Sequence, residues 1–227
     1  MTRKKIILVI VEGPSDETAL GVLLSKIFDP TKVYFHIMHS DITSDFSIKN
    51  NNILAYLGNE IKHYANSNHF ANIDFQKIIH IVDTDGAYID DNLIIEDSSC
   101  NKPLYSTNNI KTNSINNIKQ RNERKRKNID KLTNISSLWN IPYHVYYMSC
   151  NLDHVLYDKS NCSDQDKEDN AYQFAIRYRN DIEGFINFIC YSDFSVNSNY
   201  LDSWRFIKQS NESLKRHTNL GLSFPTD

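Results

Sequence analysis

Carboxylates follow two short apolar runs of the sequence, and their types and spacing are typical of a metal site. Residues 6–11 lead into Glu12, and residues 78–82 lead into Asp83 and Asp85. Buried parallel strands read as such β-branched runs, and open α/β sheets bind ligands where these strands end. If the strands are neighbours, the three carboxylates converge and raise one another's pKa. Mg²⁺ prefers oxygen ligands of this kind, so we expect Mg²⁺ here, with Mn²⁺ as a substitute.

The elements that must position these acids follow a βαβαβ order, which favours a parallel sheet with right-handed crossovers. The hydrophobic periodicity predicts strands at 6–11, 33–38, 78–82 and 143–148, and helices at 16–28, 48–65, 114–137 and 152–157. Residues 86–112 show little periodicity apart from Leu93-Ile94-Ile95 and are expected to form a long loop or an insertion. A charged linker is expected at 161–170, followed by two or three aromatic-faced helices at 171–215.

The expected fold is therefore α/β, with a mostly parallel sheet, helices on both faces and a helical C-terminal extension. The predicted division is a catalytic domain at 1–160, interrupted by an insertion at 86–140, and an extension at 161–227. A chain of 227 residues suits one sizeable domain with a helical annex.

The composition limits which binding partners and which cellular compartment are expected. The net charge of −3 gives no global basic signature, so a nucleic acid would need a local patch or a metal ion. The four cysteines form no CxxC pair, which argues against a zinc ribbon and a dithiol redox site and favours a reducing cytoplasm. The first apolar run is too short for a signal peptide, and no stretch approaches membrane-spanning length, so no membrane partner is expected.

One basic run stands out on the helix expected at 114–137. Its cations are Lys119, Arg121, Arg124, Lys125 and Arg126. On an exposed helix face they would suit the phosphates of a nucleic-acid backbone. A solvated helix face without a ligand is the alternative interpretation. We expect these five side chains to bind substrate.

Glu12-Gly13 after the first strand and Asp83-Thr84-Asp85 after the third resemble the signature of the TOPRIM fold. The resemblance covers roughly residues 5–87, and extends to 157 if the fourth strand belongs to the sheet. It implies a Rossmannoid sheet, Mg²⁺ bound by these acids and phosphodiester chemistry.

The chain is most similar to stand-alone TOPRIM nucleases of the OLD and RloB-like kind, which often act in bacterial anti-phage defence. Such proteins tend to carry an acid in a short helix after the next strand, and Asp153 occupies that place. The resemblance thus implies Asp153 as a further metal ligand. No ATPase motif is present, so an OLD-type ATPase would be a separate partner chain.

These observations favour a Mg²⁺-dependent nuclease that cleaves DNA or RNA in the cytoplasm, together with a partner ATPase or regulatory protein or a second copy of the chain. One or two metal ions would orient a water and neutralise the leaving oxygen. Glu12 would be a metal ligand or the general base, and the sequence leaves both roles open.

Two alternatives remain. The first is a TOPRIM-like scaffold that binds a partner without catalysis. The second is a HAD-type phosphatase, in which Asp83 is the nucleophile and Asp85 the acid–base. That motif normally opens the HAD fold, whereas here a complete βαβα unit precedes it, and the Glu12 turn would be left unexplained.

Overall fold

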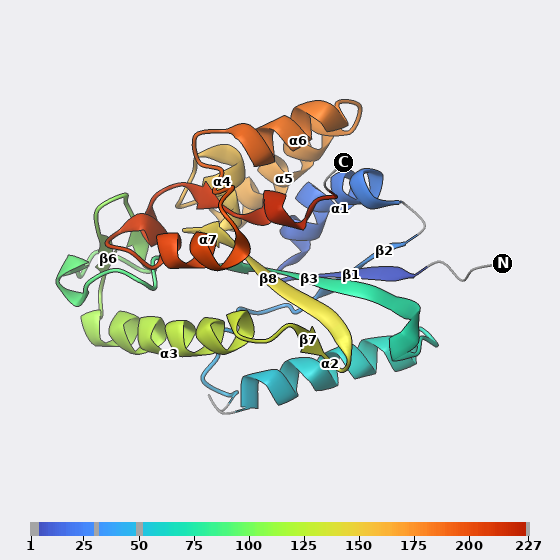
Figure 1. Ribbon diagram of the computed structural model, residues 1–227. Coiled ribbons are helices and arrows are strands. Elements are labelled where there is room, and N and C mark those ends of the chain that lie inside the picture. Colours follow the sequence, from blue (N-terminus) through green and yellow to red (C-terminus); the bar gives the residue numbers. More distant parts are fainter. Residues whose placement is uncertain (1–4, 30–31, 49–51, 226–227) are drawn as a thin grey trace.

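Four parallel strands form the centre of the protein, and their order determines which residues share the site. The computed structural model describes residues 5–29, 32–48 and 52–225. The six-stranded sheet has the order β2–β1–β3–β8–β7, with β9 pairing to β8 (Figure 1). The parallel strands are β1 (Ile6–Val11), β2 (Val33–Ile37), β3 (Phe75–Asp83) and β8 (Ile141–Ser149). The short strands β7 (Ser137–Leu138) and β9 (His217–Thr218) run antiparallel to β8.

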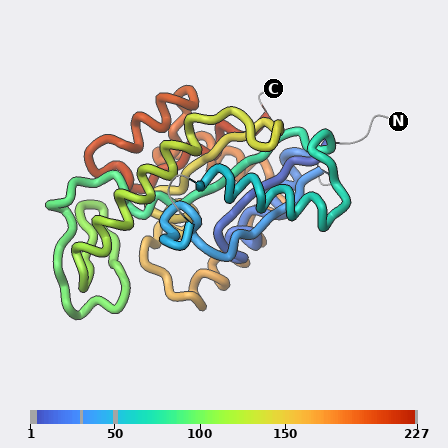
Figure 2. Tube along the Cα trace, turned by 90° about the horizontal axis from the view of Figure 1, so that it is seen from below, coloured from blue at the N-terminus to red at the C-terminus, as the bar shows by residue number. Residues whose placement is uncertain are grey.

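Both faces of the sheet are buried, as the continuous apolar runs predicted. Successive side chains of a strand point to opposite faces, so Ile7 and Val9 enter one core while Leu8 and Ile10 enter the other. One face is covered by α1 (Pro14–Phe28), α4 (Leu152–Tyr157), α5 (Asp164–Tyr178) and α6 (Ile182–Tyr191). The other is covered by α2 (Ile53–Ser67) and α3 (Ile115–Thr133), which lie next to each other (Figure 2). The α/β class with a mostly parallel sheet is thereby confirmed.

The C-terminal segment covers the β8 edge of the sheet. Helix α7 (Tyr200–Ile207) lies along β8, where the Tyr200 hydroxyl and the Trp204 indole N–H both donate to the Val145 carbonyl. Residues 161–227 thus supply α5, α6, α7 and also β9, so the expected helical extension includes part of the central sheet. Short 3₁₀ turns complete the described elements: Asn72–Asp74, Asp91–Leu93, Glu212–Leu214 and Leu220–Ser223.

Of the two structures expected at 86–112, the loop is wrong and an insertion is present, because this segment forms a second sheet. Strands β4 (Ile94–Glu96), β5 (Leu104–Tyr105) and β6 (Ile110–Thr112) have the order β4–β6–β5. Each strand is only two or three residues long, too short to show a period of two. Helix α3, which was assigned to the insertion 86–140, is the crossover between the parallel strands β3 and β8.

Several element boundaries also differ from the sequence-based expectation, three of them in ways that change an element's extent or type. The helix expected from Ile48 begins at Ile53, and residues 49–51 lie outside the described part. The helix expected to end at Ser137 ends at Thr133, and Ser137 opens β7. The linker expected at 161–170 is largely α5, whose first turn is held by a capping box between Ser163 and Asp166.

Candidate metal and phosphodiester site

Glu12 and Asp83 meet at the carboxyl ends of two neighbouring strands, as the sequence predicted. The backbone N–H of Asp83 donates to Glu12 Oε1 at 3.3 Å. Asp83 Oδ1 accepts a hydrogen bond of 3.0 Å from the Leu152 N–H in the first turn of α4. Loss of hydration on burial, reinforced by neighbouring carboxylates, raises the pKa of both groups well above the usual range.

Asp41 and Asp85 form the other half of the acidic cluster, and a lysine holds them together. Lys125 reaches from α3, its side chain fully buried, and its Nζ lies 2.8 Å from Asp41 Oδ2 and also pairs with Asp85 Oδ2. Burial alone would raise the pKa of Asp41, but Lys125 and the hydroxyls of Ser44 and Thr43 lower this pKa to about 2. The surrounding acids outweigh the burial of Lys125 and raise its pKa well above the usual range.

The turn that carries Asp85 is fixed by the insertion and by α3. Asp85 and Gly86 both have left-handed backbone angles, with φ of 48° and 63°. A Cβ on Gly86 would lie 2.4 Å from a methyl group of Leu214, so the position requires glycine. Arg121 donates to the Asp85 carbonyl at 2.7 Å and to the Tyr105 hydroxyl at 2.5 Å.

Asp153 lies near Asp16, an acid that the sequence analysis did not select and whose charge acts on Asp83. Asp153 is in the first turn of α4, and its Oδ2 is 3.8 Å from Lys167 Nζ. Burial raises the pKa of Asp153 and raises that of Asp16 to about 6, with the charge of Asp153 adding to the shift of Asp16. Asp16 accepts a 2.9 Å hydrogen bond from the Gly13 N–H, so it closes the turn that presents Glu12.

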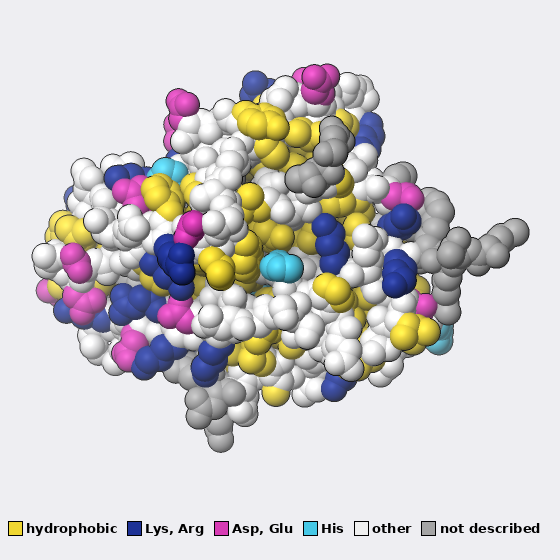
Figure 3. Space-filling model, viewed as in Figure 1, with side chains coloured by type: hydrophobic (Ala, Val, Ile, Leu, Met, Phe, Trp, Pro, Cys, Tyr) yellow, Lys and Arg dark blue, Asp and Glu magenta, His cyan; other side chains and the backbone are white. Residues whose placement is uncertain are grey.

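The basic run of α3 lies partly inside the molecule. Arg121 and Lys125 point into the acidic cluster, as described above. Arg124 donates to the Asp45 carbonyl at 2.9 Å and Arg126 to the Ala87 carbonyl at 3.0 Å. Lys119 is half-exposed and lies 3.4 Å from Asp91. Around α3 the surface Lys and Arg side chains are interspersed with Asp and Glu (Figure 3). The exposed face expected for the whole run is wrong for Lys125, whose side chain is fully buried, and a role in substrate binding stays a prediction for the other four cations.

A pocket of about 220 Å³ opens beside Asp83 and Asp85. Lys102 and Lys167 line it from the insertion and from α5, and Tyr105 and Asn151 complete the wall nearest the acids. Lys102 is anchored by a 3.1 Å hydrogen bond to the Cys162 carbonyl. The pocket therefore places two cations next to two carboxylates, a combination suited to a phosphate held beside a metal ion.

Donor chemistry at the site suits a hard divalent cation. Among the described residues, no group of three or more His, Cys, Asp and Glu side chains is already arranged to hold a metal ion. Lys125 supplies the positive charge for Asp41 and Asp85, whereas no ion pair of the described part reaches Glu12 or Asp83. The charge of Lys125 also lowers the pKa of Glu12 and Asp83, but it does not offset their burial, so these two carboxylates are the ones whose oxygens fit Mg²⁺.

Comparisons with known proteins add no relative to this picture. A scan against protein-family models found no match, and searches of curated proteins and of solved structures found none either. No helix in the described residues has the length and apolar character needed to cross a membrane. The TOPRIM-like resemblance remains a prediction from the residues that carry it.

Proposed function

We propose that the protein is a Mg²⁺-dependent nuclease whose metal is held by Glu12 and Asp83, with Asp85 and Asp153 at its border. The observation that carries the proposal is the Glu12–Asp83 pair. These carboxylates lie at the ends of adjacent parallel strands, burial disfavours their charge more than Lys125 offsets it, and no cation of the described part forms an ion pair with either. Charge of that kind in a protein interior calls for a counter-ion.

Each group around the pair has a role in this account. A bound Mg²⁺ ion would neutralise the negative charge that develops on the phosphate during cleavage. It would also lower the pKa of a bound water, which could then attack the phosphate. Lys102 and Lys167 would hold the substrate phosphate against the carboxylates. Asp16, with a pKa of about 6, can hold or release a proton near neutral pH, which suits a general acid–base group. Lys125 would fix Asp85 in place.

The test is cleavage of plasmid DNA and of a structured RNA pool that includes tRNA, in Mg²⁺, Mn²⁺ or EDTA. We expect metal-dependent cleavage that falls by at least roughly 100-fold in Asp83→Asn and Glu12→Gln, because changes to mere outer partners of a metal site already cost 10–100-fold. Asp91→Asn is the matched control, since Asp91 is an exposed acid outside the pocket.

Two outcomes would contradict the proposal: cleavage that survives EDTA, or cleavage that survives in folded Asp83→Asn. A phosphate monoester assayed in parallel separates the phosphatase alternative, which predicts release of inorganic phosphate without strand cleavage. A defence role and a partner ATPase are proposed on the resemblance alone.

A further inference from the structure

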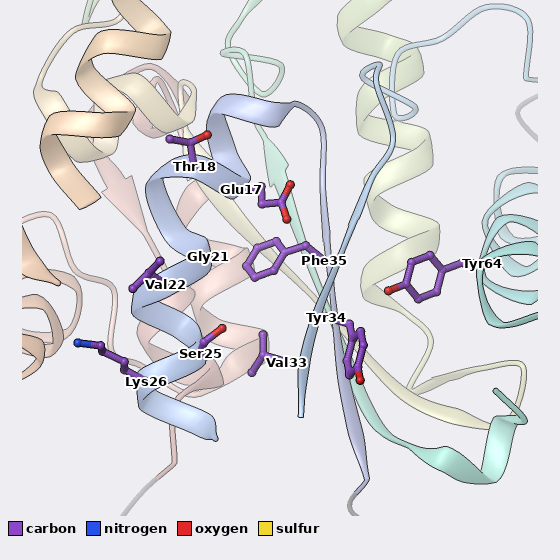
Figure 4. A pocket seen from close by; sticks show the side chains of 10 residues that line it. All are labelled: Glu17, Thr18, Gly21, Val22, Ser25, Lys26, Val33, Tyr34, Phe35 and Tyr64. Carbon is purple, nitrogen blue, oxygen red and sulfur yellow. The ribbon is translucent and has the colours of Figure 1, made fainter. Parts of the chain in front are cut away.

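The size of a cavity does not by itself mark a binding site in this protein. A groove of about 770 Å³ lies between α1 and β2, but none of the acids of the candidate site lines it (Figure 4). The pocket beside Asp83 and Asp85 is smaller, at about 220 Å³, and Tyr105 forms part of its wall. The hydroxyl of Tyr105 contacts Arg121 and Asp85, so it links a cation of α3 to the acids of the pocket.

Arg121 determines how the Tyr105 hydroxyl is used. The guanidinium donates to the Tyr105 oxygen at 2.5 Å, and a guanidinium has no acceptor of its own. The phenol oxygen therefore accepts this hydrogen bond, and its single proton remains for another partner. The acceptor that the structure gives it is Asp85 Oδ1 at 3.5 Å, longer than the roughly 2.5–3.0 Å of an ordinary O–H···O bond. The hydroxyl thus keeps a weakly used donor on the side of the pocket's acids.

Tyr105 and its partner are both held in place by further hydrogen bonds. The Tyr105 N–H donates to Asn161 Oδ1 at 2.8 Å, and Asn161 Nδ2 donates to the Tyr105 carbonyl at 2.8 Å. The guanidinium of Arg121 also donates to Asn122 Oδ1 and to the Asp85 carbonyl, each at 2.7 Å. The hydroxyl is therefore fixed both from the loop after α4 and from α3. A donor that is fixed before the substrate arrives needs no reorganisation during the reaction.

The Tyr105 phenol keeps its proton at neutral pH. Burial, reinforced by the charge of Asp85, raises the pKa of Tyr105 above its usual range by more than Arg121 lowers it. The group is therefore a hydrogen-bond donor and neither a base nor a nucleophile. Arg121 forms no ion pair with a side-chain carboxylate among the described residues, and it donates to neutral oxygens. Its positive charge beside the phenol strengthens a hydrogen bond from Tyr105 to an anion.

We propose that Tyr105 is a catalytic residue whose hydroxyl donates a hydrogen bond to a non-bridging oxygen of the substrate phosphate, and that Arg121 positions it. The inference rests on the proposed nuclease function, because the phosphate in question is the one held beside Asp83 and Asp85. Charge is spread over the equatorial oxygens in the transition state of phosphoryl transfer. A fixed donor aimed at one of them stabilises that state more than the bound substrate.

The first test is Tyr105→Phe, which removes only the hydroxyl. We expect kcat for metal-dependent cleavage to fall by roughly 100-fold, the lower end of the cost of losing one oxyanion-hole donor, with KM nearly unchanged. The affinity for Mn²⁺, measured by calorimetry, should also stay the same, because the carboxylates are intact. Tyr172→Phe is the matched control, since Tyr172 is 58% exposed on α5. Wild-type kcat in a folded Tyr105→Phe chain would overturn the proposal.

Sulfur substitution in the substrate tests which atom the hydroxyl contacts. Oligonucleotides with an Rp or an Sp phosphorothioate at the cleaved linkage replace one non-bridging oxygen by sulfur, a weaker hydrogen-bond acceptor. We expect the wild type to cleave one isomer more slowly, and equally slowly in Mg²⁺ and Mn²⁺, because this oxygen faces Tyr105 and not the metal. The ratio of the two rates should fall toward one in Tyr105→Phe and stay unchanged in Tyr172→Phe. No such penalty in the wild type, or a penalty that persists in Tyr105→Phe, would contradict the contact.

Arg121→Met tests whether the arginine acts through the tyrosine. We expect it to lower kcat and to reduce the same sulfur penalty, because the phenol loses its fixed direction. The double variant Tyr105→Phe with Arg121→Met should be no slower than the slower single variant, since both changes remove one contact. A simple structural role for Arg121 would leave the sulfur penalty intact, and additive losses would contradict positioning.

Phosphate binding separates this inference from the nuclease assignment. Inorganic phosphate titrated into the Mg²⁺-loaded whole chain should bind a few-fold more weakly to Tyr105→Phe than to the wild type or Tyr172→Phe. Equal phosphate affinity in the three proteins, or metal-dependent cleavage that is indifferent to Tyr105→Phe, would defeat the tyrosine contact alone. Phosphate binding that depends on Tyr105 in a chain without cleavage would support the contact and defeat the nuclease function.

Discussion

The acidic cluster has two halves, which differ in how their charge is balanced. Asp41 and Asp85 share the fully buried ammonium of Lys125, and the pKa of Asp41 falls to about 2. Glu12 and Asp83 form no ion pair in the described part, and burial raises the pKa of both more than the charge of Lys125 lowers it. One half of the site is therefore balanced within the fold. The other half is open to an external cation, and this is the half we assign to the metal.

The two halves predict opposite dependence of stability on pH. Asp41 has a folded pKa below its unfolded value, so its contribution is present above about pH 4 and is lost as the pH falls toward 2. Asp83 and Glu12 have folded pKa values above their unfolded ones. The folded state then binds more protons, so without a metal their contribution to stability is lost as the pH rises through the folded pKa.

Removal of the built-in cation should have the largest effect. Lys125→Met leaves Asp41 and Asp85 without a counter-charge, and breaking a buried pair typically costs about 3–5 kcal/mol of unfolding free energy. Urea unfolding at pH 7 measures the loss. Lys127→Met on the same helix is the control, because Lys127 pairs with Glu123 in solvent and should change little. Equal unfolding free energies for the two variants would contradict the claim that Lys125 balances the charge of Asp41 and Asp85.

Addition of a divalent cation should stabilise the fold. A ligand that binds only the native state adds about 2.7 kcal/mol when it is present at 100 times its dissociation constant. Thermal unfolding should therefore shift upward in Mg²⁺ or Mn²⁺ relative to EDTA. The shift should vanish in Asp83→Asn but persist in Asp91→Asn, which alters an exposed acid. An identical shift in both variants would place the metal elsewhere.

Replacement of the Asp83 carboxylate by a neutral amide should raise the free energy of unfolding in the absence of metal. In EDTA at pH 8 we expect Asp83→Asn to be more stable than the wild type by roughly 1 kcal/mol, the scale of an unsatisfied buried polar group. The difference should shrink toward pH 4, where the wild-type carboxyl holds its own proton. Chemical unfolding across this pH range measures it, and a destabilised variant at pH 8 would contradict the assigned burial cost.

The pocket lysines should give the smallest effect. If Lys102 and Lys167 hold a substrate phosphate, Lys167→Ala and Lys102→Ala should raise KM for cleavage a few-fold and leave kcat nearly unchanged. Lys62→Ala, an exposed lysine on α2 across the sheet, is the control. A fall in kcat without a change in KM would point to a role in chemistry instead of binding.

The open half of the site was predictable from sequence, whereas of the balanced half only Asp85 was predicted as a metal ligand. Long β-branched runs identify β1 and β3, and their neighbourhood brings Glu12 to Asp83. Asp41 joins the cluster only because β2 lies beside β1, and its segment carries no apolar run that ends in the acid. The order of strands in a sheet depends on the tertiary fold, so the sequence around Asp41 could not show that this residue lies beside Glu12.

Lys125 shows a signal that was present but misinterpreted. The buried stripe of α3 has helical spacing and includes Ile118, Asn122, Lys125, Ile129 and Leu132. Periodicity alone therefore places Lys125 on the inward face, whereas its place in a basic run suggested an exposed one. A cation on an apolar stripe indicates a buried acid opposite it.

The most direct test of the account is Mn²⁺ binding, measured by titration calorimetry on the whole chain at pH 7.5, with wild type, Asp83→Asn and Asp91→Asn compared. The account predicts binding that weakens by at least roughly tenfold in Asp83→Asn and is unchanged in Asp91→Asn. Equal affinity in all three proteins, or no binding by the wild type, would contradict the assignment of the metal to the Glu12–Asp83 half.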